Sequence, residues 1–520
     1  MYDVYAESQL DDQLKFDKSM PIAGVNNTLP PAEIDSTLLA DACDRLSQRD
    51  GLNRPRPGII KRAKAPDAIS SWDWSIHMTN GVFLCVSGGH WYTWDSRGKI
   101  LTALSGGPAY ASGAFISGAM ATDTVYFSNG TGMAKYKPGI GFGTVTTLPS
   151  QYPNAAYILW GLGPRLYYVP PFSNIIVCSN ILDPEVYDPT LVNLIQLDPV
   201  TSDWITGIAI WQEQQLIVGR NGATYAVGSG IQTPIAQWSI SDVSRVVGSI
   251  NHPAMTQVGL DIYFLSETGR GVYSVSQMPS SEQLGVQAPV SLPIGRYIDR
   301  INWAAAATQA RAICWNDLYM LAVPLDNAQN NNCILIYSIP LGTWQGIWEP
   351  DSPIRSFSRD PTNSAATYLL AARLDGTLAQ WTYPQARQYY DLELDGLTAT
   401  EFESSLVTRS FTFGEEFNMF GPYNGKFTFL ESDNPVTISA ILDRLTTSIS
   451  SFETTSLPHT DLVIPSLPFN LYGAGYVIVP VALQKTGLCN ELQFQMTGEG
   501  NWTLAKILCS AFSVRAPANV

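Results

Sequence analysis

The chain has 520 residues, of which 45% are hydrophobic and 14% charged, and its formal net charge is −15 at pH 7. This length exceeds one ordinary hydrophobic core, so two or more domains are expected. The negative charge argues against a protein that grips nucleic-acid phosphates, because that affinity comes from clustered lysine and arginine. The charged fraction lies below the roughly 25% of a typical soluble domain. This favours either a surface buried against partners or one in which Thr, Ser, Asn and Gln replace charge.

Residues 1–66 differ from the rest of the chain and are predicted to form an extended N-terminal arm. The stretch up to about Pro31 is polar and has no hydrophobic period. Residues 30–46 begin with prolines, carry early acidic residues and have an apolar spacing typical of a short helix. Residues 49–66 are turn-rich and locally basic. The N-terminus lacks the basic and apolar regions of a secretory signal, and no stretch approaches the length of a membrane span. We therefore expect synthesis in a reducing cytoplasm and no membrane-spanning segment.

A strand–tight turn–strand unit recurs through residues 67–394, at intervals of about 40–60 residues. Its copies lie at 82–94, 125–136, 166–177, 216–227, 262–275, 318–337 and 368–381. Each copy follows another β-like stretch, at 71–78, 112–120, 157–163, 204–212, 255–261, 310–315 and 353–359. Four short strands per period are typical of a propeller blade. The count predicts six or seven blades, with a short helix within 292–309.

The repeated hairpin pattern ends at about residue 395. Alternating strands are predicted at 404–414, 425–432, 435–443, 472–483, 490–500 and 501–514. Within one of them, Leu492, Phe494 and Met496 point the same way, as in a half-buried antiparallel strand. The sequence therefore predicts an all-β protein: a six- to seven-bladed β-propeller over 67–394, a C-terminal β-sandwich-like domain over 395–520 and the extended arm over 1–66.

Candidate chemical groups are scattered and form no recognised constellation. The four histidines, His77, His90, His252 and His459, lack metal-ligand spacing. The seven cysteines are Cys43, Cys85, Cys178, Cys314, Cys333, Cys489 and Cys509. They are odd in number and never spaced as CxxC, so buried free thiols are expected. The sequence contains no GxSxG, GxxxxGK[ST] or HExxH motif. We predict no catalytic, cofactor-binding or metal-binding residues, and no cofactor.

Three segments imitate functional motifs. Residues 391–403 begin like a calcium loop, but Phe402 stands where a bidentate glutamate is needed, so a linker leaving the last blade is the better interpretation. Residues 93–100 resemble part of a sialidase Asp-box without its Thr-Trp end, and only once. The glycine-rich 139–143 does not fit a dinucleotide fingerprint and is predicted to be a loop.

Two parts of the chain resemble the propeller proteins of short-tailed phage tails, known as tail nozzle, tail hub or head-to-tail stabilisation proteins. Residues 27–58 look like the family's opening, with Leu29-Pro30-Pro31, then Asp50-Gly51, then Arg56-Pro57-Gly58. Residues 407–432 and 436–443 are similar to its post-propeller pattern, in which a Thr-Arg pair leads to Phe-x-Phe-Gly, a Lys and a strand. Residues 483–515 resemble its final strands. The polar arm before residue 27 departs from the pattern.

The resemblance implies a virion structural protein without enzymatic activity. Such proteins form a ring, commonly of six copies, below the portal and adaptor rings; they extend the DNA channel and anchor tail fibres or a plug. The implied partners are further copies of the chain, portal and adaptor proteins, tail-fibre or tail-tip proteins, and genomic DNA that passes through the lumen without specific binding. The implied location is the virion tail, after synthesis in the host cytoplasm. A net negative surface suits a conduit to which DNA must not adhere.

Two other classes of function stay open. One is a carbohydrate-active propeller enzyme of sialidase-like or lyase-like type, because propeller active sites gather residues from different blades. The other is a peptide-binding scaffold propeller, although the chain lacks the Trp-Asp and Gly-His pattern of the commonest such repeats.

Overall fold

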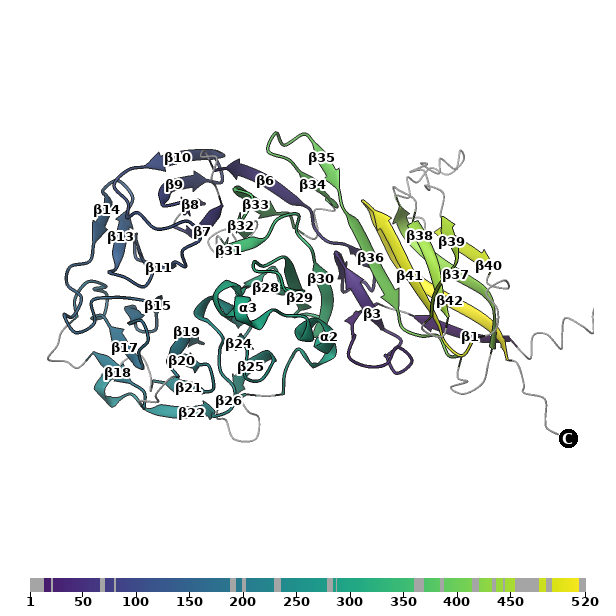
Figure 1. Ribbon diagram of the computed structural model, residues 1–520, viewed down its shortest axis with the longest axis horizontal. Coiled ribbons are helices and arrows are strands. Elements are labelled where there is room, and N and C mark those ends of the chain that lie inside the picture. The colour runs from purple at the N-terminus through teal and green to yellow at the C-terminus, as the bar shows by residue number, and fades with distance from the viewer. Residues whose placement is uncertain are drawn as a thin grey trace, which may run out of the picture.

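The computed structural model describes most of the chain as strands. The described residues are 14–19, 22–65, 71–78, 81–187, 193–198, 203–228, 235–277, 284–286, 288–359, 369–383, 388–413, 420–432, 436–442, 445–453, 477–482 and 489–513. Figure 1 shows a wheel of small sheets beside an elongated pair of sheets. Among the described residues, none of the helices combines the length and apolar character needed to cross a membrane.

Seven four-stranded units form the wheel, so the predicted propeller is confirmed with seven blades. The first six blades are β7–β10 (Trp72–His77, Val82–Ser87, His90–Asp95, Ile100–Leu104), β11–β14 (Ser117–Ala121, Thr124–Ser128, Ala134–Lys137, Gly141–Thr144), β15–β18 (Tyr157–Gly161, Arg165–Val169, Ile175–Cys178, Leu194–Gln196), β19–β22 (Ile205–Trp211, Gln215–Arg220, Thr224–Val227, Ile240–Ser244), β23–β26 (Met255–Val258, Asp261–Ser266, Gly271–Gln277, Leu284–Val286) and β27–β30 (Arg311–Trp315, Leu318–Val323, Cys333–Ser338, Thr343–Trp348).

The seventh blade takes strands from both ends of the repeat region. It consists of β31 (Ile354–Arg359), β32 (Leu369–Arg373), β33 (Thr377–Trp381) and β6 (Ile59–Lys64). Strand β6 pairs antiparallel with β33, from Ile59 opposite Trp381 to Lys64 opposite Thr377. Because β6 directly precedes the first blade in sequence, this pairing closes the circle with backbone hydrogen bonds. Strand pairing therefore crosses the predicted division at residue 66.

The blades pack face to face, which explains their near-continuous apolar strands. In β20, Leu216, Ile217 and Val218 are all buried, because neighbouring blades cover both faces of the sheet. The first strand of each blade packs against the first strand of the next, and β31 packs against β7. These seven first strands surround the propeller axis.

Two further sheets pack into the predicted C-terminal sandwich. One contains β1 (Leu14–Ser19), β4 (Arg45–Ser47), β5 (Asn53–Pro55), β37 (Phe420–Ser432), β40 (Val477–Ala482) and β42 (Trp502–Ser513). The other contains β2 (Gly24–Val25), β3 (Leu38–Cys43), β36 (Glu403–Thr408), β38 (Val436–Leu442), β39 (Leu445–Glu453) and β41 (Leu492–Glu499). Phe427 and Phe494 meet in the core between them, with ring centroids 5.0 Å apart. The predicted shared face of Leu492, Phe494 and Met496 is buried.

The helix predicted within residues 30–46 is wrong, because the chain there forms turns and then strands β3 and β4. Strand β3 has a bulge between Leu39 and Asp41 where it pairs with β36. The bulge places the buried Leu39 and Ala42 three residues apart, which imitates a helical period. By contrast, the helix predicted within 292–309 is confirmed by η3 (Leu292–Ile294), α2 (Gly295–Asp299) and α3 (Trp303–Gln309). Two single turns, η1 (Ile235–Gln237) and η2 (His252–Ala254), lie elsewhere.

Two segments that were predicted to be a linker or a loop also contain strands. Residues 391–403, predicted to be a linker, overlap the hairpin β34 (Tyr390–Leu392) and β35 (Ala399–Glu401), which joins β6 through Leu392 and Ile60. The glycine-rich 139–143, predicted to be a loop, runs into β14, the last strand of the second blade.

Candidate functional site

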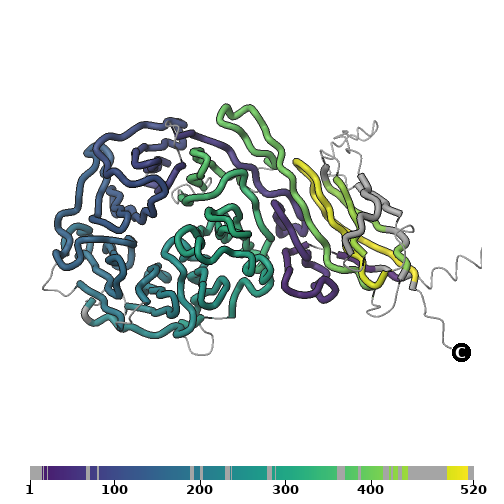
Figure 2. The backbone as a smooth tube through the Cα atoms, viewed as in Figure 1, coloured from purple at the N-terminus to yellow at the C-terminus, as the bar shows by residue number. Residues whose placement is uncertain are grey.

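The N-terminal segment 22–64 lies between the propeller and the sandwich and belongs to both. Figure 2 shows this segment in purple, passing between the green strands of the last blades and the yellow C-terminal strands. Strand β3 bridges β30 of the sixth blade at Cys43 and Ile347, and on its other side pairs with β36 of the sandwich. One ten-stranded sheet thus runs from the sixth blade into the sandwich. We call this connection, made by residues 22–64, the interlock.

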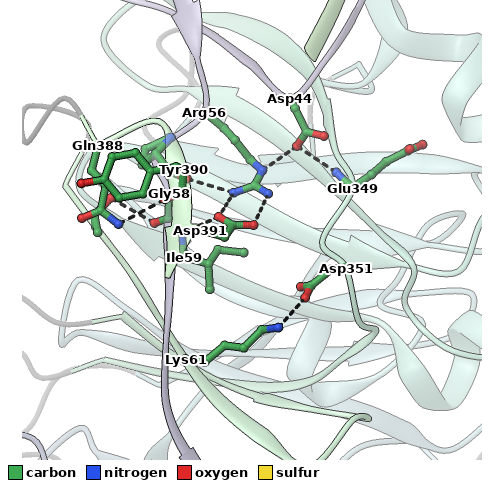
Figure 3. A network of polar contacts seen from close by, with 12 residues as sticks. Asp44, Arg56, Gly58, Ile59, Lys61, Glu349, Asp351, Gln388, Tyr390 and Asp391 are labelled. Atoms are coloured by element: carbon green, nitrogen blue, oxygen red, sulfur yellow. Dashed lines mark hydrogen bonds and ion pairs between the residues drawn. The ribbon is translucent and has the colours of Figure 1, made fainter. Parts of the chain in front are cut away.

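Arg56 is the centre of the interlock (Figure 3). Its Nη1 and Nη2 donate to Oδ1 and Oδ2 of Asp391 over 3.0 and 2.9 Å, and its Nε donates to Oδ1 of Asp44 over 2.7 Å. Its guanidinium also lies over the ring of Phe402, 3.8 Å from the centroid. Asp391 accepts the Ile59 amide at 2.7 Å, and Asp44 accepts the Glu349 amide at 3.1 Å. The arginine therefore ties together the arm, the sixth blade and the hairpin after the seventh.

Burial and the neighbouring charges shift the pKa values of this network in opposite directions. Burial alone would lower the pKa of Arg56, but the carboxylates of Asp44 and Asp391 raise it above its usual value. Burial raises the pKa of Asp44 to about 6, and Arg56 opposes that rise. A buried ion pair of this kind adds little net stability but is costly to break. The network therefore specifies the arrangement of the parts it joins.

Arg45 makes a second buried contact of the same segment, within the sandwich. Its Nε and Nη2 donate to Oδ1 and the carbonyl oxygen of Asn53, both over 2.7 Å, and its Nη1 donates to the Trp502 carbonyl over 3.0 Å. Its guanidinium lies 3.6 Å from the centroid of the Trp502 ring. Burial lowers the pKa of Arg45 well below its usual value, and the stacked ring and carbonyl acceptors offset part of that cost.

Residues that carry the sequence resemblance lie in the interlock and in the sandwich beside it. A Cβ added to Gly58 would lie 2.0 Å from the Tyr390 carbonyl oxygen, so only glycine allows the arm to approach β34. The Thr408 hydroxyl accepts the Phe494 amide at 2.9 Å, and Arg409 pairs with Asp17 at 2.5 Å. These positions therefore have structural roles, and the acidic Asp391 is a ligand of Arg56.

A second cluster lies at the propeller axis. It is made by residues at or near the start of the first strands: Asp73, Phe115, Tyr157, His252, Arg311 and Arg355. Arg311 of the sixth blade lies over Phe115 of the second blade, with 5.4 Å from the guanidinium carbon to the ring centroid. Phe115 contacts Tyr157 edge to face at 6.1 Å, and Tyr157 contacts His252 at 5.3 Å. We call these six residues the axial cluster; they fill this part of the axis with side chains from opposite blades.

A pocket of about 260 Å³ opens beside the axial cluster. Its lining includes Asp73, Gly113, Phe115, Gln309, Arg311 and Arg355. The Asp73 carboxylate accepts hydrogen bonds from the Gly88 amide at 3.0 Å and the Gly113 amide at 2.9 Å. Arg311 donates to the backbone carbonyls of Thr308, Ala310 and Arg355, over 2.8–3.0 Å. Neither Arg311 nor Arg355 takes part in an ion pair with another described residue.

Enclosure by the protein changes the pKa of two groups in the axial cluster. Burial, and then the charge of Arg355, lowers the pKa of Arg311 to about 10, so it stays charged at neutral pH. Burial lowers the pKa of His252 to about 4. The Nδ1 atom of this histidine accepts the Ile208 amide at 3.3 Å, which requires its lone pair. His252 is therefore a neutral hydrogen-bond acceptor at pH 7.

The remaining sequence candidates are not brought together. His77 lies in β7 against Phe83, His90 begins β9 at the surface, and His459 lies outside the described residues. All seven cysteines are free, and five of them are buried, as predicted: Cys85, Cys178, Cys333, Cys489 and Cys509. In the described part of the chain, no three His, Cys, Asp or Glu residues form a group able to hold a metal ion.

Sequence reasoning missed the axial cluster. Asp73, Phe115, Tyr157, Arg311 and Arg355 all lie in the β-like stretches that precede the repeated hairpins. The available signal was their common place near the beginning of each stretch, because first strands of a propeller begin around one axis.

Comparisons with known proteins give likeness of fold alone. No family model matches the sequence, and no curated protein matches it. Among solved structures, the β-propeller domain of Myceliophteria thermophila Cps50 (Swd1) is 11% identical, with a TM-score of 0.41 over 62% of this chain and 99% of that one. A chain of the mitotic checkpoint complex is 13% identical, with a TM-score of 0.42 over 62% and 94%. Virginiamycin B lyase from Staphylococcus aureus is 10% identical, with a TM-score of 0.39 over 71% and 99%. The propeller fold itself rests on the strand pairing of the seven blades.

Proposed function

We propose that this chain is a structural subunit of a short-tailed phage tail, a nozzle or hub that forms a ring below the portal and adaptor. The observation that carries the proposal is the interlock. It contains Arg56 and Gly58 of the Arg-Pro-Gly element through which the chain resembles such proteins. It joins a closed propeller to a β-sandwich through a continuous sheet and a buried ion-pair network. A block joined in this way is suited to bear load.

The arrangement also bears on where DNA would pass. Phe115, Tyr157 and Arg311 fill part of the propeller axis, so the axis of one subunit is not the conduit. We propose that the DNA lumen lies between the copies of the ring, bordered by the surfaces of several subunits. The net charge of −15 would keep such a lumen from retaining DNA.

Native mass spectrometry and negative-stain microscopy of the purified chain, alone and with the portal and adaptor proteins, test the proposal. A closed ring, commonly of six copies, that binds the adaptor is expected. A monomer with no affinity for portal, adaptor or tail-fibre proteins would contradict it. A hydrolysis or elimination activity in a glycan screen would instead favour a carbohydrate-active propeller.

A peptide-binding scaffold is the second candidate, because a pocket with two arginines opens beside the axial cluster. A scaffold would stay monomeric and bind its peptide as a monomer, whereas a tail subunit forms the ring. The two candidates are therefore separated by the same mass measurement.

A further inference from the structure

We propose that the axial pocket binds a carboxylate group, presented by an acidic side chain, a peptide C-terminus or a small free acid. This role is separate from the proposed function, because the pocket lies within one propeller and needs no ring. Arg311 and Arg355 would bind the carboxylate oxygens, with Gln309 and Gly113 at the sides of the pocket.

The state of Arg355 is the first argument. Its Nε is buried and has no hydrogen-bond partner among the described residues, while its Nη1 donates to Oε1 of Gln309 over 3.2 Å. A Cβ added to Gly113 would lie 3.5 Å from Nη2 of this arginine, so the glycine leaves that nitrogen uncovered. Because Nε is shielded from solvent, a carboxylate oxygen in the pocket would meet this guanidinium at Nη2. A charge-assisted contact at Nη2 would partly compensate a guanidinium whose Nε has no acceptor.

The charge of the pocket is the second argument, and it selects the ligand. Arg311 and Arg355 contribute two positive charges and Asp73 one negative charge. The Asp73 oxygens already accept two backbone amides and the Ser71 hydroxyl, so the carboxylate is held in place as a fixed charge. The remaining single positive charge matches a monoanion better than a phosphate dianion. The planar guanidinium fork also fits the two oxygens of a carboxylate.

Saturation-transfer NMR of the full chain with acetate tests the proposal. Acetate is expected to bind the wild type, and Arg355→Gln is expected to weaken binding about tenfold or more, because it removes a charge-assisted contact. The matched control is Arg245→Gln, which removes an exposed propeller arginine and should leave acetate binding unchanged. Absence of acetate binding, or equal binding by the wild type and R355Q, would overturn the proposal. Tighter binding of phosphate than of acetate would overturn the assignment to a carboxylate.

A second variant guards against a folding defect in R355Q. Gln309→Glu would place a carboxylate against Arg355, where the glutamine oxygen now accepts. This variant should melt at a higher temperature than the wild type and lose acetate binding. If Q309E binds acetate as the wild type does, the pocket is not the site.

Two peptides distinguish the sources of the carboxylate. Acetyl-tetraalanine offers only a C-terminal carboxylate, and an amidated acetyl-Ala-Ala-Asp-Ala-Ala offers only a side chain. The peptide that binds more tightly than acetate identifies a C-terminus or an acidic side chain as the natural group. If both bind more weakly than acetate, a small free acid is the ligand.

Discussion

The interlock and the axial cluster both enclose arginines, but they neutralise them differently. Arg56 faces two carboxylates, and all three side chains hydrogen-bond one another or the backbone. In the axial cluster, Arg311 binds backbone carbonyls and stacks on Phe115, while one nitrogen of Arg355 lacks a partner. A satisfied network is expected to fix structure, whereas a buried donor without a partner calls for an explanation such as a bound ligand. Four changes test whether this difference is real.

The largest effect is expected from Asp391→Asn. The amide would direct hydrogens toward Arg56 and leave a buried charge half paired, so the free energy of unfolding should fall by about 3–5 kcal/mol. Denaturant unfolding measures it. Asp326→Asn is the matched control, because Asp326 also accepts two hydrogen bonds from one arginine, Arg300, but at the surface; this substitution should cost about 1 kcal/mol or less. Equal losses from the two variants would show that the interlock is no more than a surface pair.

The second-largest effect is expected in the pH dependence of stability, through His252 of the axial cluster. The folded pKa of His252, about 4, lies below its unfolded value near 6.5. The contribution of His252 to the free energy of unfolding is therefore fully present above pH 6.5 and is lost as the pH falls toward 4. The loss amounts to at most about 3 kcal/mol, before screening by water reduces it. His252→Gln should flatten the dependence of the unfolding free energy on pH in that window. His90→Gln, at the surface, should leave it unchanged; a similar flattening by H90Q would refute the assignment to His252.

A smaller effect is expected from Asp44→Asn, although Asp44 contacts the same arginine as Asp391. Burial raises the pKa of Asp44 to about 6, so its charge is held at a cost that the amide avoids. The amide oxygen can still accept from Arg56, which keeps its two-point pair with Asp391. The expected loss is about 1 kcal/mol by denaturant unfolding. A loss as large as that of D391N would mean that Asp44 is the main counter-ion.

The smallest effect should come from Arg355→Gln in the absence of any carboxylate, and it should have the opposite sign. The change removes a positive charge beside Arg311 and a donor without an acceptor. Thermal unfolding in chloride buffer should show no loss of stability, or a gain of up to about 1 kcal/mol. A loss of several kcal/mol would place Arg355 among the structural arginines, beside Arg56.

The sequence predicted the repeated hairpins of the blades but missed the strand pairs formed between distant parts of the chain. The hairpins revealed the blades because each strand pair is a neighbour in sequence, as in Leu216–Val218 beside the strand of Tyr225. The partner of β6 lies more than 300 residues away, and no local pattern identifies it. The apolar spacing within residues 30–46 predicted a helix, and the structure has a strand there whose period is shifted by a bulge between Leu39 and Asp41. Arg56 was singled out by the family resemblance, but its partner Asp391 was assigned to a linker.

The closing strand also has a consequence for the order in which the protein is made. Strand β6 leaves the ribosome before any blade, yet its partner β33 follows only after six blades have been synthesised. At about 5–20 residues per second, the early strand waits for tens of seconds. During that time its edge is open to other chains, as is the edge of β3, whose partner β36 comes later still. The lysines and arginines of residues 59–64, Lys61, Arg62 and Lys64, are suited to keep such an edge from aggregating until the circle closes.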